Sequence, residues 1–248
     1  MLSKLVYVLW FVAPALQCAI AGRMWVRRLY RDYPLFFSYV LVHLVSFPLI
    51  LYLFHFGGKD LYRYTFVSFE SLDAVLKFAV ICELFSQVFY PYQGIRSLGS
   101  MVLRWGGVAL LLVALVAAAR GIGSDSDRFL AGLFVIARSV EIVQAGLILL
   151  LFAASASLGL QWKQEAFAIA SGFGLIACVN LAAYTLRVQF GGASTDLLSL
   201  IANAGYDCAV LLWLAALWAR TTVHKFDRRI PSWDIESWNR ALSNMLRQ

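Results

Sequence analysis

The stretch FVSFESLDAVLKFAVICELF, residues 66–85, combines the length of a membrane-spanning helix with four ionisable side chains. About 20 predominantly apolar residues are enough for a helix to cross the hydrocarbon core of a bilayer. A charged side chain that faces lipid costs about 2.5–3.5 kcal/mol on insertion scales, so these side chains are expected to face other helices. The stretch therefore predicts a bundle of spanning helices with a polar interior. The ionisable residues are Glu70, Asp73, Lys77 and Glu83.

The composition of the whole chain is that of a membrane protein. Of its 248 residues, 61% are hydrophobic and only 14% are charged, whereas about 25% of the residues of a soluble domain are charged. Lipid cannot hydrogen-bond the backbone, so a spanning chain forms helices or a closed barrel. The alternating strands of a barrel are absent from the sequence. The sequence therefore predicts an all-α, polytopic transmembrane helical bundle in contact with the lipid bilayer.

Seven apolar segments approach the spanning length, and the connections between them are too short for a folded domain. The first segment resembles a signal peptide, but the basic residues that directly follow it favour a retained anchor. Residues 1–222 are therefore predicted to form one seven-helix transmembrane domain. The predicted spans are residues 4–22, 35–56, 66–90, 100–120, 129–157, 165–188 and 195–220.

Arginines and lysines predict the orientation of the bundle. With the N-terminus outside, ten of these residues fall on the inner side and six on the outer side, and cytoplasmic loops carry the excess of such residues. The prediction is N-out and C-in, and the compact loops favour the inner membrane of a bacterium within the class of multi-pass cell-membrane proteins. The net charge of +7 arises mostly at segment ends, so no nucleic-acid partner is expected.

Residues 223–248 are predicted to be a cytoplasmic tail. Within it, five apolar residues share an arc of about 100° at helical spacing. This pattern predicts an amphipathic helix on the inner membrane surface, with a frayed tail and a helix that docks to a partner as the alternatives. The five residues are Ile235, Trp238, Leu242, Met245 and Leu246.

Polar residues within the predicted spans form helical stripes. On the third span, Glu70, Asp73 and Lys77 lie within about 60° of one another, and Asp73 and Lys77 have the i,i+4 spacing of a favourable ion pair. Lys77, Glu141 and Asp207 lie near the midpoints of spans three, five and seven. Asp73, Arg138 and Asn203 lie about one turn further out. We therefore expect these three spans to meet along a shared polar seam.

The seam supplies the candidate site for a ligand or ion. Because acidic groups outnumber basic groups in it, an unpaired acid would take up a proton or hold a cation, and Asp207 and Glu141 are the favoured acids. The candidate residues are Asp73, Lys77, Arg138, Glu141, Asn203, Tyr206 and Asp207, with Glu70, Asn180 and Tyr184 as a second group.

No pattern of an enzyme or a metal centre is found. His43, His55 and His224 lack the spacing of metal ligands, and no P-loop, nucleophile elbow or dinucleotide fingerprint is present. His43 is expected to be a hydrogen-bonded residue of the bundle. The prediction is a non-enzymatic protein without a cofactor.

The expected number of helices resembles that of microbial rhodopsins and of G-protein-coupled receptors. The residues that define these families are missing. Span seven has no lysine for a retinal Schiff base and no NPxxY motif, and span three ends in FYPYQG, residues 89–94, in place of DRY. The resemblance is one of helix number and implies nothing about activity.

Two functions remain open at this point. The first is an integral membrane protein that binds a small molecule or ion in the polar seam, for sensing or transport. The alternative is an accessory subunit of a membrane complex, whose buried charges only fix the pairing of helices and whose apolar faces meet membrane-protein partners. A lipid-modifying enzyme is disfavoured because no nucleophile or metal site has convincing spacing.

Overall fold

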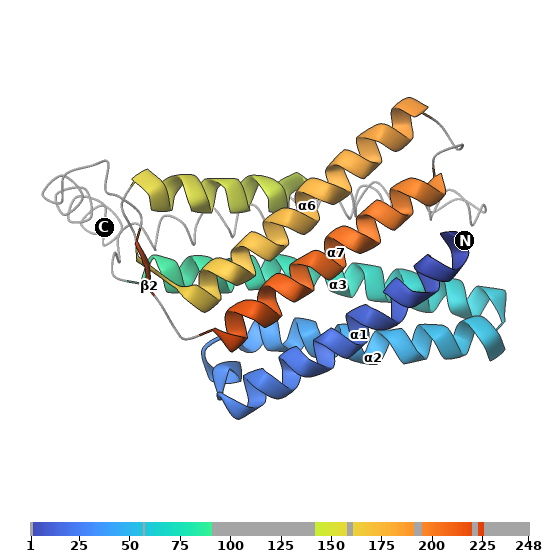
Figure 1. Cartoon of the computed structure of the whole chain (residues 1–248), viewed down its shortest axis with the longest axis horizontal. Coiled ribbons are helices and arrows are strands. Elements are labelled where there is room, and N and C mark those ends of the chain that lie inside the picture. The colour runs from blue at the N-terminus through green and yellow to red at the C-terminus, as the bar shows by residue number, and fades with distance from the viewer. Residues whose placement is uncertain are drawn as a thin grey trace, which may run out of the picture. The chain divides into compact units, whose positions relative to one another are not determined.

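The computed structural model describes residues 2–56, 58–90, 142–157, 161–190, 195–219 and 223–225 (Figure 1). Within these residues the chain is helical except for two strands of three residues each. The elements are α1 (Leu2–Val26), the 3-10 helix η1 (Leu29–Arg31), α2 (Pro34–Phe56), α3 (Lys59–Val88), a helix over Ile142–Ser157, β1 (Gln161–Lys163), α6 (Gln164–Phe190), α7 (Thr195–Trp218) and β2 (Val223–Lys225).

Three of the described helices are long and apolar enough to cross a membrane. They lie over Pro34–Phe56, Gln164–Ala183 and Leu197–Trp218, with mean hydropathies of 2.0, 1.9 and 1.6. These candidate spans are what a multi-pass membrane protein requires. α3 is also long enough, with 30 residues, but its ionisable side chains set it apart from these three.

The predicted helices are confirmed where the structure describes them. Helices occupy the predicted spans one, two, three, six and seven, and Ile142–Ser157 covers the second half of span five. The predicted span 100–120 and the predicted helix in the tail lie outside the described residues. α3 begins at Lys59, before the predicted boundary at residue 66. An apolar run marks only the part of a helix that can lie in lipid, and helical hydrogen bonding continues beyond it into polar residues.

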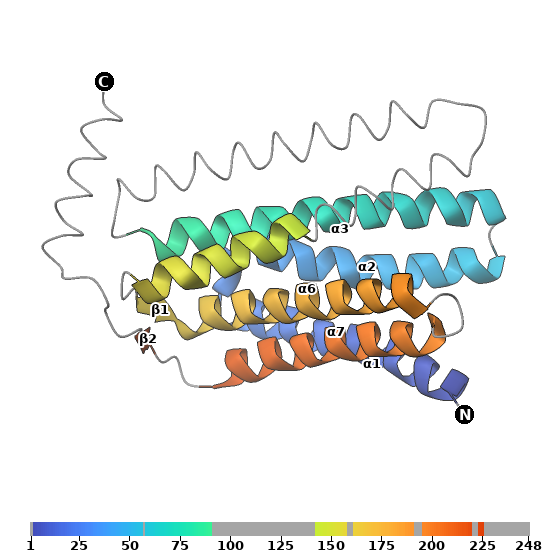
Figure 2. The ribbon, with the colours of Figure 1, turned by 90° about the horizontal axis from the view of Figure 1, so that it is seen from above.

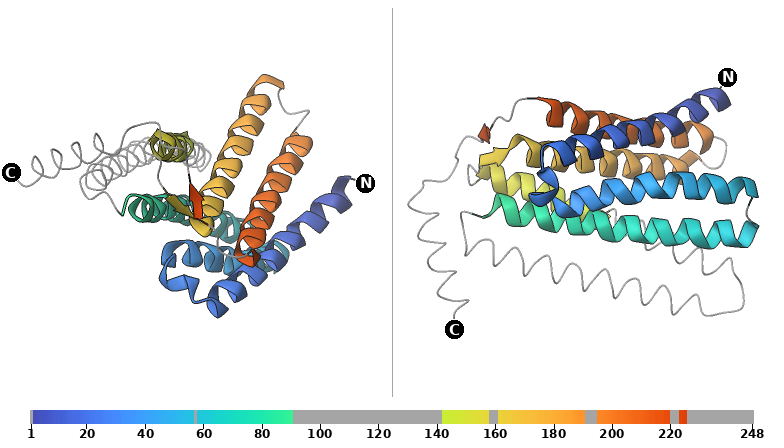
Figure 3. Two further views of the ribbon diagram at one scale, coloured as in Figure 1. Left: turned by 60° about the vertical axis from the view of Figure 1, so that its left-hand side comes forward. Right: turned by 90° about the horizontal axis from the view of Figure 1, so that it is seen from below.

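The chain divides into two compact units. The first contains Met1–Val80 and Ala168–Thr221, and the second contains Ile81–Phe167 and Thr222–Gln248. In the first unit, α1 packs against α2 and α7 (Figure 3). α6 and α7 run side by side in the same unit, as seen from above (Figure 2).

An aromatic core joins α2, α6 and α7 in the first unit. Phe36 and Phe173 each have their ring centroid 5.1 Å from the ring of Trp213, and Tyr39 lies 5.1 Å from Phe173. The indole N–H of buried Trp213 donates to the carbonyl oxygen of Ile169 at 3.3 Å. Buried aromatic rings with a satisfied polar group fix the relative positions of these three helices.

The second unit has its own aromatic cluster. Phe152 stacks on Trp162 with ring centroids 5.3 Å apart, and Phe167 packs edge-on against both rings. Trp162 belongs to β1, which pairs antiparallel with β2 so that residues 162 and 224 are partners. The sequence did not predict these strands, because three residues are too few for alternation to be recognised.

Gly172 is required for the close approach of α6 and α7. A Cβ atom at this position would lie 2.1 Å from Nε1 of Trp213, and overpacking of this kind destabilises a protein by about 1–3 kcal/mol. We expect Gly172→Ala to lower the thermal unfolding temperature of the detergent-purified protein. Gly22→Ala is the matched control, because a Cβ atom at Gly22 meets nothing within 4 Å. Equal unfolding temperatures for Gly172→Ala and the wild type would contradict this packing.

Candidate functional site

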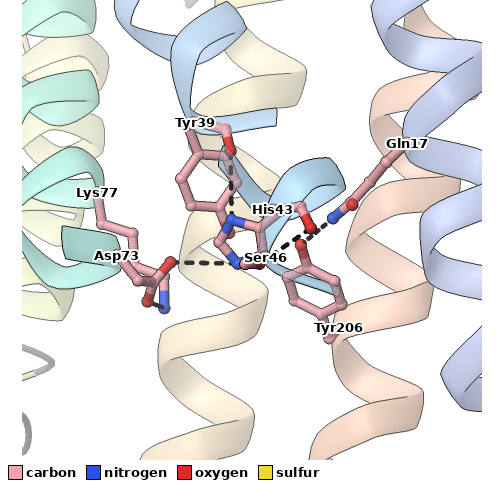
Figure 4. A network of polar contacts seen from close by, with 7 residues as sticks. All are labelled: Gln17, Tyr39, His43, Ser46, Asp73, Lys77 and Tyr206. Carbon is pink, nitrogen blue, oxygen red and sulfur yellow. Dashed lines mark hydrogen bonds and ion pairs between the residues drawn. The ribbon is translucent and has the colours of Figure 1, made fainter. Parts of the chain in front are cut away.

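A network of polar side chains crosses the first unit from α3 through α2 to α7 and α1 (Figure 4). Each of these helices contributes at least one residue. The network consists of Gln17 on α1, Tyr39, His43 and Ser46 on α2, Asp73 and Lys77 on α3, and Tyr206 on α7.

Asp73 is the charged centre of this network. Its Oδ2 atom lies 2.6 Å from Nζ of Lys77, one helical turn further along α3. This contact confirms the predicted i,i+4 ion pair. Its Oδ1 atom lies 3.3 Å from Nε2 of His43 on α2. Asp73 therefore links α3 to α2, and its carboxylate also neutralises the charge of Lys77 on the same helix.

The imidazole ring of His43 is held from several sides. Its Nδ1 atom lies 3.2 Å from the carbonyl oxygen of Tyr39, one turn earlier on α2. The ring centroid lies 4.4 Å from that of Tyr39 and 5.8 Å from that of Tyr206, which is nearly parallel to it at 20°. The hydroxyl of Ser46 donates to the carbonyl oxygen of His43 at 3.0 Å. These contacts fix the direction in which Nε2 points.

The two nitrogens of His43 both face oxygen atoms that accept hydrogen bonds. A neutral imidazole has one N–H and one lone pair, and an ionised carboxylate has no proton to give. If Nδ1 donates to the Tyr39 carbonyl, the lone pair of Nε2 faces Oδ1 of Asp73. That oxygen is buried and accepts no hydrogen bond within the described residues. Contacts that are favourable at both nitrogens at once therefore need one further proton, carried either by the imidazole ring or by the Asp73 carboxyl group.

The network continues from His43 to α1 through Tyr206. The side-chain amide of Gln17 donates to the hydroxyl of Tyr206 at 2.5 Å, and Gln17 is buried with 3% of its surface exposed. The hydroxyl groups of Tyr39 and Tyr206 are also close enough to interact electrostatically. Hydrogen bonds, an ion pair and a ring contact together thus connect α3 with α1.

The structure brings three of the predicted site residues into this network, namely Asp73, Lys77 and Tyr206. Asp207, next to Tyr206 on α7, is buried with 6% exposure, and within the described part of the chain its Oδ2 atom has no hydrogen-bond partner. Among the other predicted residues, Asn203 and Asn180 are half-buried on α7 and α6, and Glu70 is exposed on α3. Arg138, Glu141 and the side chain of Tyr184 lie outside the described residues.

Sequence reasoning missed the helices that connect α3 with α7. It expected spans three, five and seven to meet, and this expectation stays a prediction because Arg138 and Glu141 of span five lie outside the described residues. The described network runs through α2 and α1. A signal was present, because Tyr39, His43 and Ser46 have i, i+4 and i+7 spacing on an otherwise apolar helix. An expectation based on charged residues does not include this neutral stripe or the lone amide of Gln17. The expectation that His43 is a hydrogen-bonded residue of the bundle agrees with its contacts.

The comparisons with protein-family models, with curated proteins and with solved structures found no match for this chain. Within the described residues, no group of three or more His, Cys, Asp or Glu side chains could hold a metal ion.

The Asp73–Lys77 pair gives a test of the network's energetics. We expect Asp73→Asn to lower the free energy of unfolding by about 1–3 kcal/mol, because it removes the ion pair between this carboxylate and the ammonium of Lys77. The double variant Asp73→Asn/Lys77→Met removes both charges and should recover part of the loss. Unfolding in mixed micelles measures both effects, with Asp32→Asn as the control, because Asp32 is an exposed carboxylate outside the network. Additive effects of the two single substitutions would show that the pair contributes no coupling energy.

Proposed function

We propose that the chain is a non-enzymatic integral membrane protein that binds an ion in the polar network, for sensing or transport, and that this ion is a proton held between His43 and Asp73. The observation that carries the proposal is the pair of acceptor oxygens facing the two nitrogens of His43. The proposed location is the cell membrane, with the protein as a multi-pass component.

The position of these groups in the bundle supports the proposal. An ionisable side chain within a spanning segment is costly, and such residues commonly mark ion pathways and proton relays. Histidine is the side chain whose charge changes closest to neutral pH when its surroundings do not perturb it. His43 lies on α2, one of the three candidate spans, and faces Asp73 across the helix interface.

Protonation would change the contacts that hold α3 to α2. Without the additional proton, Asp73, Lys77 and neutral His43 sum to zero charge, and with it they sum to one positive charge. A proton on the Asp73 carboxyl group would weaken the ion pair of Asp73 with Lys77 and would let the carboxyl group donate to Nε2 of His43. A proton on Nε2 would instead strengthen the attraction between His43 and the Asp73 carboxylate. In either case proton binding alters an interhelical contact, which is the property that a sensor or a coupled transporter needs.

Several further groups surround this pair and would respond to its charge. α1 contributes the amide of Gln17, α2 the hydroxyl of Tyr39, and α7 the hydroxyl of Tyr206. The carboxylates of Glu70 on α3 and Asp207 on α7 also act electrostatically on these hydroxyl groups. The negative charge of these carboxylates favours the binding of an added proton over that of an added anion.

Infrared difference spectroscopy between acidic and alkaline buffers tests the proposal. The wild type should show imidazole or carboxyl bands that change with pH, and both His43→Gln and Asp73→Asn should lose the same bands. His55→Gln is the matched control, because His55 makes the same Nδ1 contact to a carbonyl oxygen one turn earlier, 3.0 Å from Leu51, at an exposed position. Bands that survive in both network variants would contradict the proposal.

Proton flux into liposomes separates transport from sensing. A transporter should dissipate an imposed pH difference faster than protein-free liposomes, and Asp73→Asn should remove this acceleration. A sensor should show the infrared change without the flux. Pyranine fluorescence inside the liposomes provides the measurement, with His55→Gln again as the control.

The accessory-subunit function is favoured by one observation, the local pairing of Asp73 with Lys77 within α3. If the charges only fix helix pairing, the double variant Asp73→Asn/Lys77→Met should unfold at the temperature of the wild type, and the infrared bands should not change with pH. Partners captured from native membranes would then define the function.

A further inference from the structure

One end of the first unit concentrates arginine and aromatic side chains. It is formed by the C-terminal end of α1, by η1 and by the C-terminal end of α7. We call it the arginine end. Its arginines are Arg23, Arg27, Arg28 and Arg31, and its aromatic residues are Trp25, Tyr30 and Trp218. A single carboxylate, the exposed Asp32, lies in the same turn.

Two of the arginines hold the helices together. The guanidinium groups of Arg27 and Arg23 donate to the carbonyl oxygen of Leu217, at 2.9 and 3.4 Å. The last carbonyl groups of a helix lack partners within the helix, and cations are favourable near them. Arg23 also lies over the ring of Trp218, 5.2 Å from its centroid. These contacts account for Arg23 and Arg27 as structural residues.

The other two arginines, Arg28 and Arg31, are exposed. Their turn is nevertheless well defined, because the N–H of Arg28 donates to Trp25 at 3.1 Å and the N–H of Arg31 donates to the carbonyl of Arg28 at 3.2 Å. Arg28 has φ 57° and ψ 22° and is the one non-glycine residue with positive φ in the described part of the chain. Glycine adopts this conformation more easily than arginine does. On backbone conformation alone, glycine would therefore be favoured over arginine at position 28.

Exposed tryptophans flank these arginines. Trp25 is 64% exposed and Trp218 is 58% exposed, and Trp25 stacks on Tyr30 with ring centroids 5.3 Å apart. Tryptophan and tyrosine are enriched where a membrane protein meets the headgroup region of the bilayer. The candidate span of α2 begins at Pro34 and that of α7 ends at Trp218. Both residues lie at the arginine end, so this end is placed where lipid headgroups would lie.

We propose that the arginine end binds an anionic phospholipid, with its phosphate held by Arg28 and Arg31 and with Trp25 and Trp218 at the boundary between headgroups and acyl chains. The planar guanidinium group matches the oxygens of a phosphate in a bidentate arrangement. The exposed indole rings favour a lipid over a free anion, because a free phosphate would leave these apolar surfaces uncovered. This inference does not depend on the proposed function of the polar network.

The test measures binding of a short-chain phosphatidylglycerol to the detergent-purified full chain. One basic residue near a membrane surface contributes a factor of about five in binding. The double variant Arg28→Gly/Arg31→Gln should therefore bind about 25-fold more weakly than the wild type. Its fold should be retained, because Arg28→Gly relieves the left-handed conformation. Arg63→Gln, near the start of α3, is the matched control and should bind as the wild type does.

A second measurement uses nanodiscs. The wild type should unfold at a higher temperature in an equimolar mixture of phosphatidylcholine and phosphatidylglycerol than in phosphatidylcholine alone, and the double variant should lose this difference while unfolding normally in phosphatidylcholine. The proposal is overturned if the double variant keeps the difference or if Arg63→Gln abolishes it equally. It is also overturned if inorganic phosphate, added in detergent, reproduces the whole effect, since the site would then recognise a free anion.

Discussion

The contact between His43 and Asp73 is the interaction on which the polar interior of the first unit depends. Asp73 could satisfy one oxygen within its own helix, through Lys77, but its second oxygen faces α2. In a low-dielectric interior an unpaired carboxylate oxygen is costly, so this atom determines which face of α3 meets α2. The ring of His43 is then held between Tyr39 and Tyr206, and Tyr206 receives the hydrogen bond of Gln17. A series of contacts that begins at the Asp73 carboxyl group thus connects α3, α2, α7 and α1.

Close packing beside the network keeps this geometry in place. Helices in lipid associate through van der Waals contact and hydrogen bonds, because the surrounding acyl chains are as apolar as the helices themselves. Gly172 makes room for the indole of Trp213, and a Cβ atom at Gly205 would lie 2.8 Å from the side chain of Val179. Both contacts bring α6 close to α7. The aromatic core that includes Tyr39 is therefore closely packed beside His43, and this packing helps to keep Nε2 of His43 directed at Asp73.

The sequence predicts helices and ion pairs that depend on residues close together in the chain. It does not predict contacts between residues that lie far apart in the chain. Apolar runs identify helices because lipid requires about 20 such residues, and the spacing of Asp73 and Lys77 alone predicts their ion pair. The choice of partner helix has no such local signal. Tyr206 was recognised on a polar stripe, but its partner Gln17 lies 189 residues away in the chain. The start of α3 at Lys59 and the pairing of β1 with β2 were missed for a related reason, since neither has a periodic pattern long enough to be read.

Two contacts between α1 and α7 connect the arginine end with the polar network. Gln17 meets Tyr206, and about ten residues further along both helices Arg27 meets Leu217. The two helices therefore run in the same direction. Ten helical residues correspond to about 15 Å, which is half of the roughly 30 Å hydrocarbon core. If the arginine end lies among lipid headgroups, the network lies near the middle of the membrane, where a proton held by His43 and Asp73 would be far from water on both sides. Anchoring by anionic lipid would then set the depth of the proposed proton site.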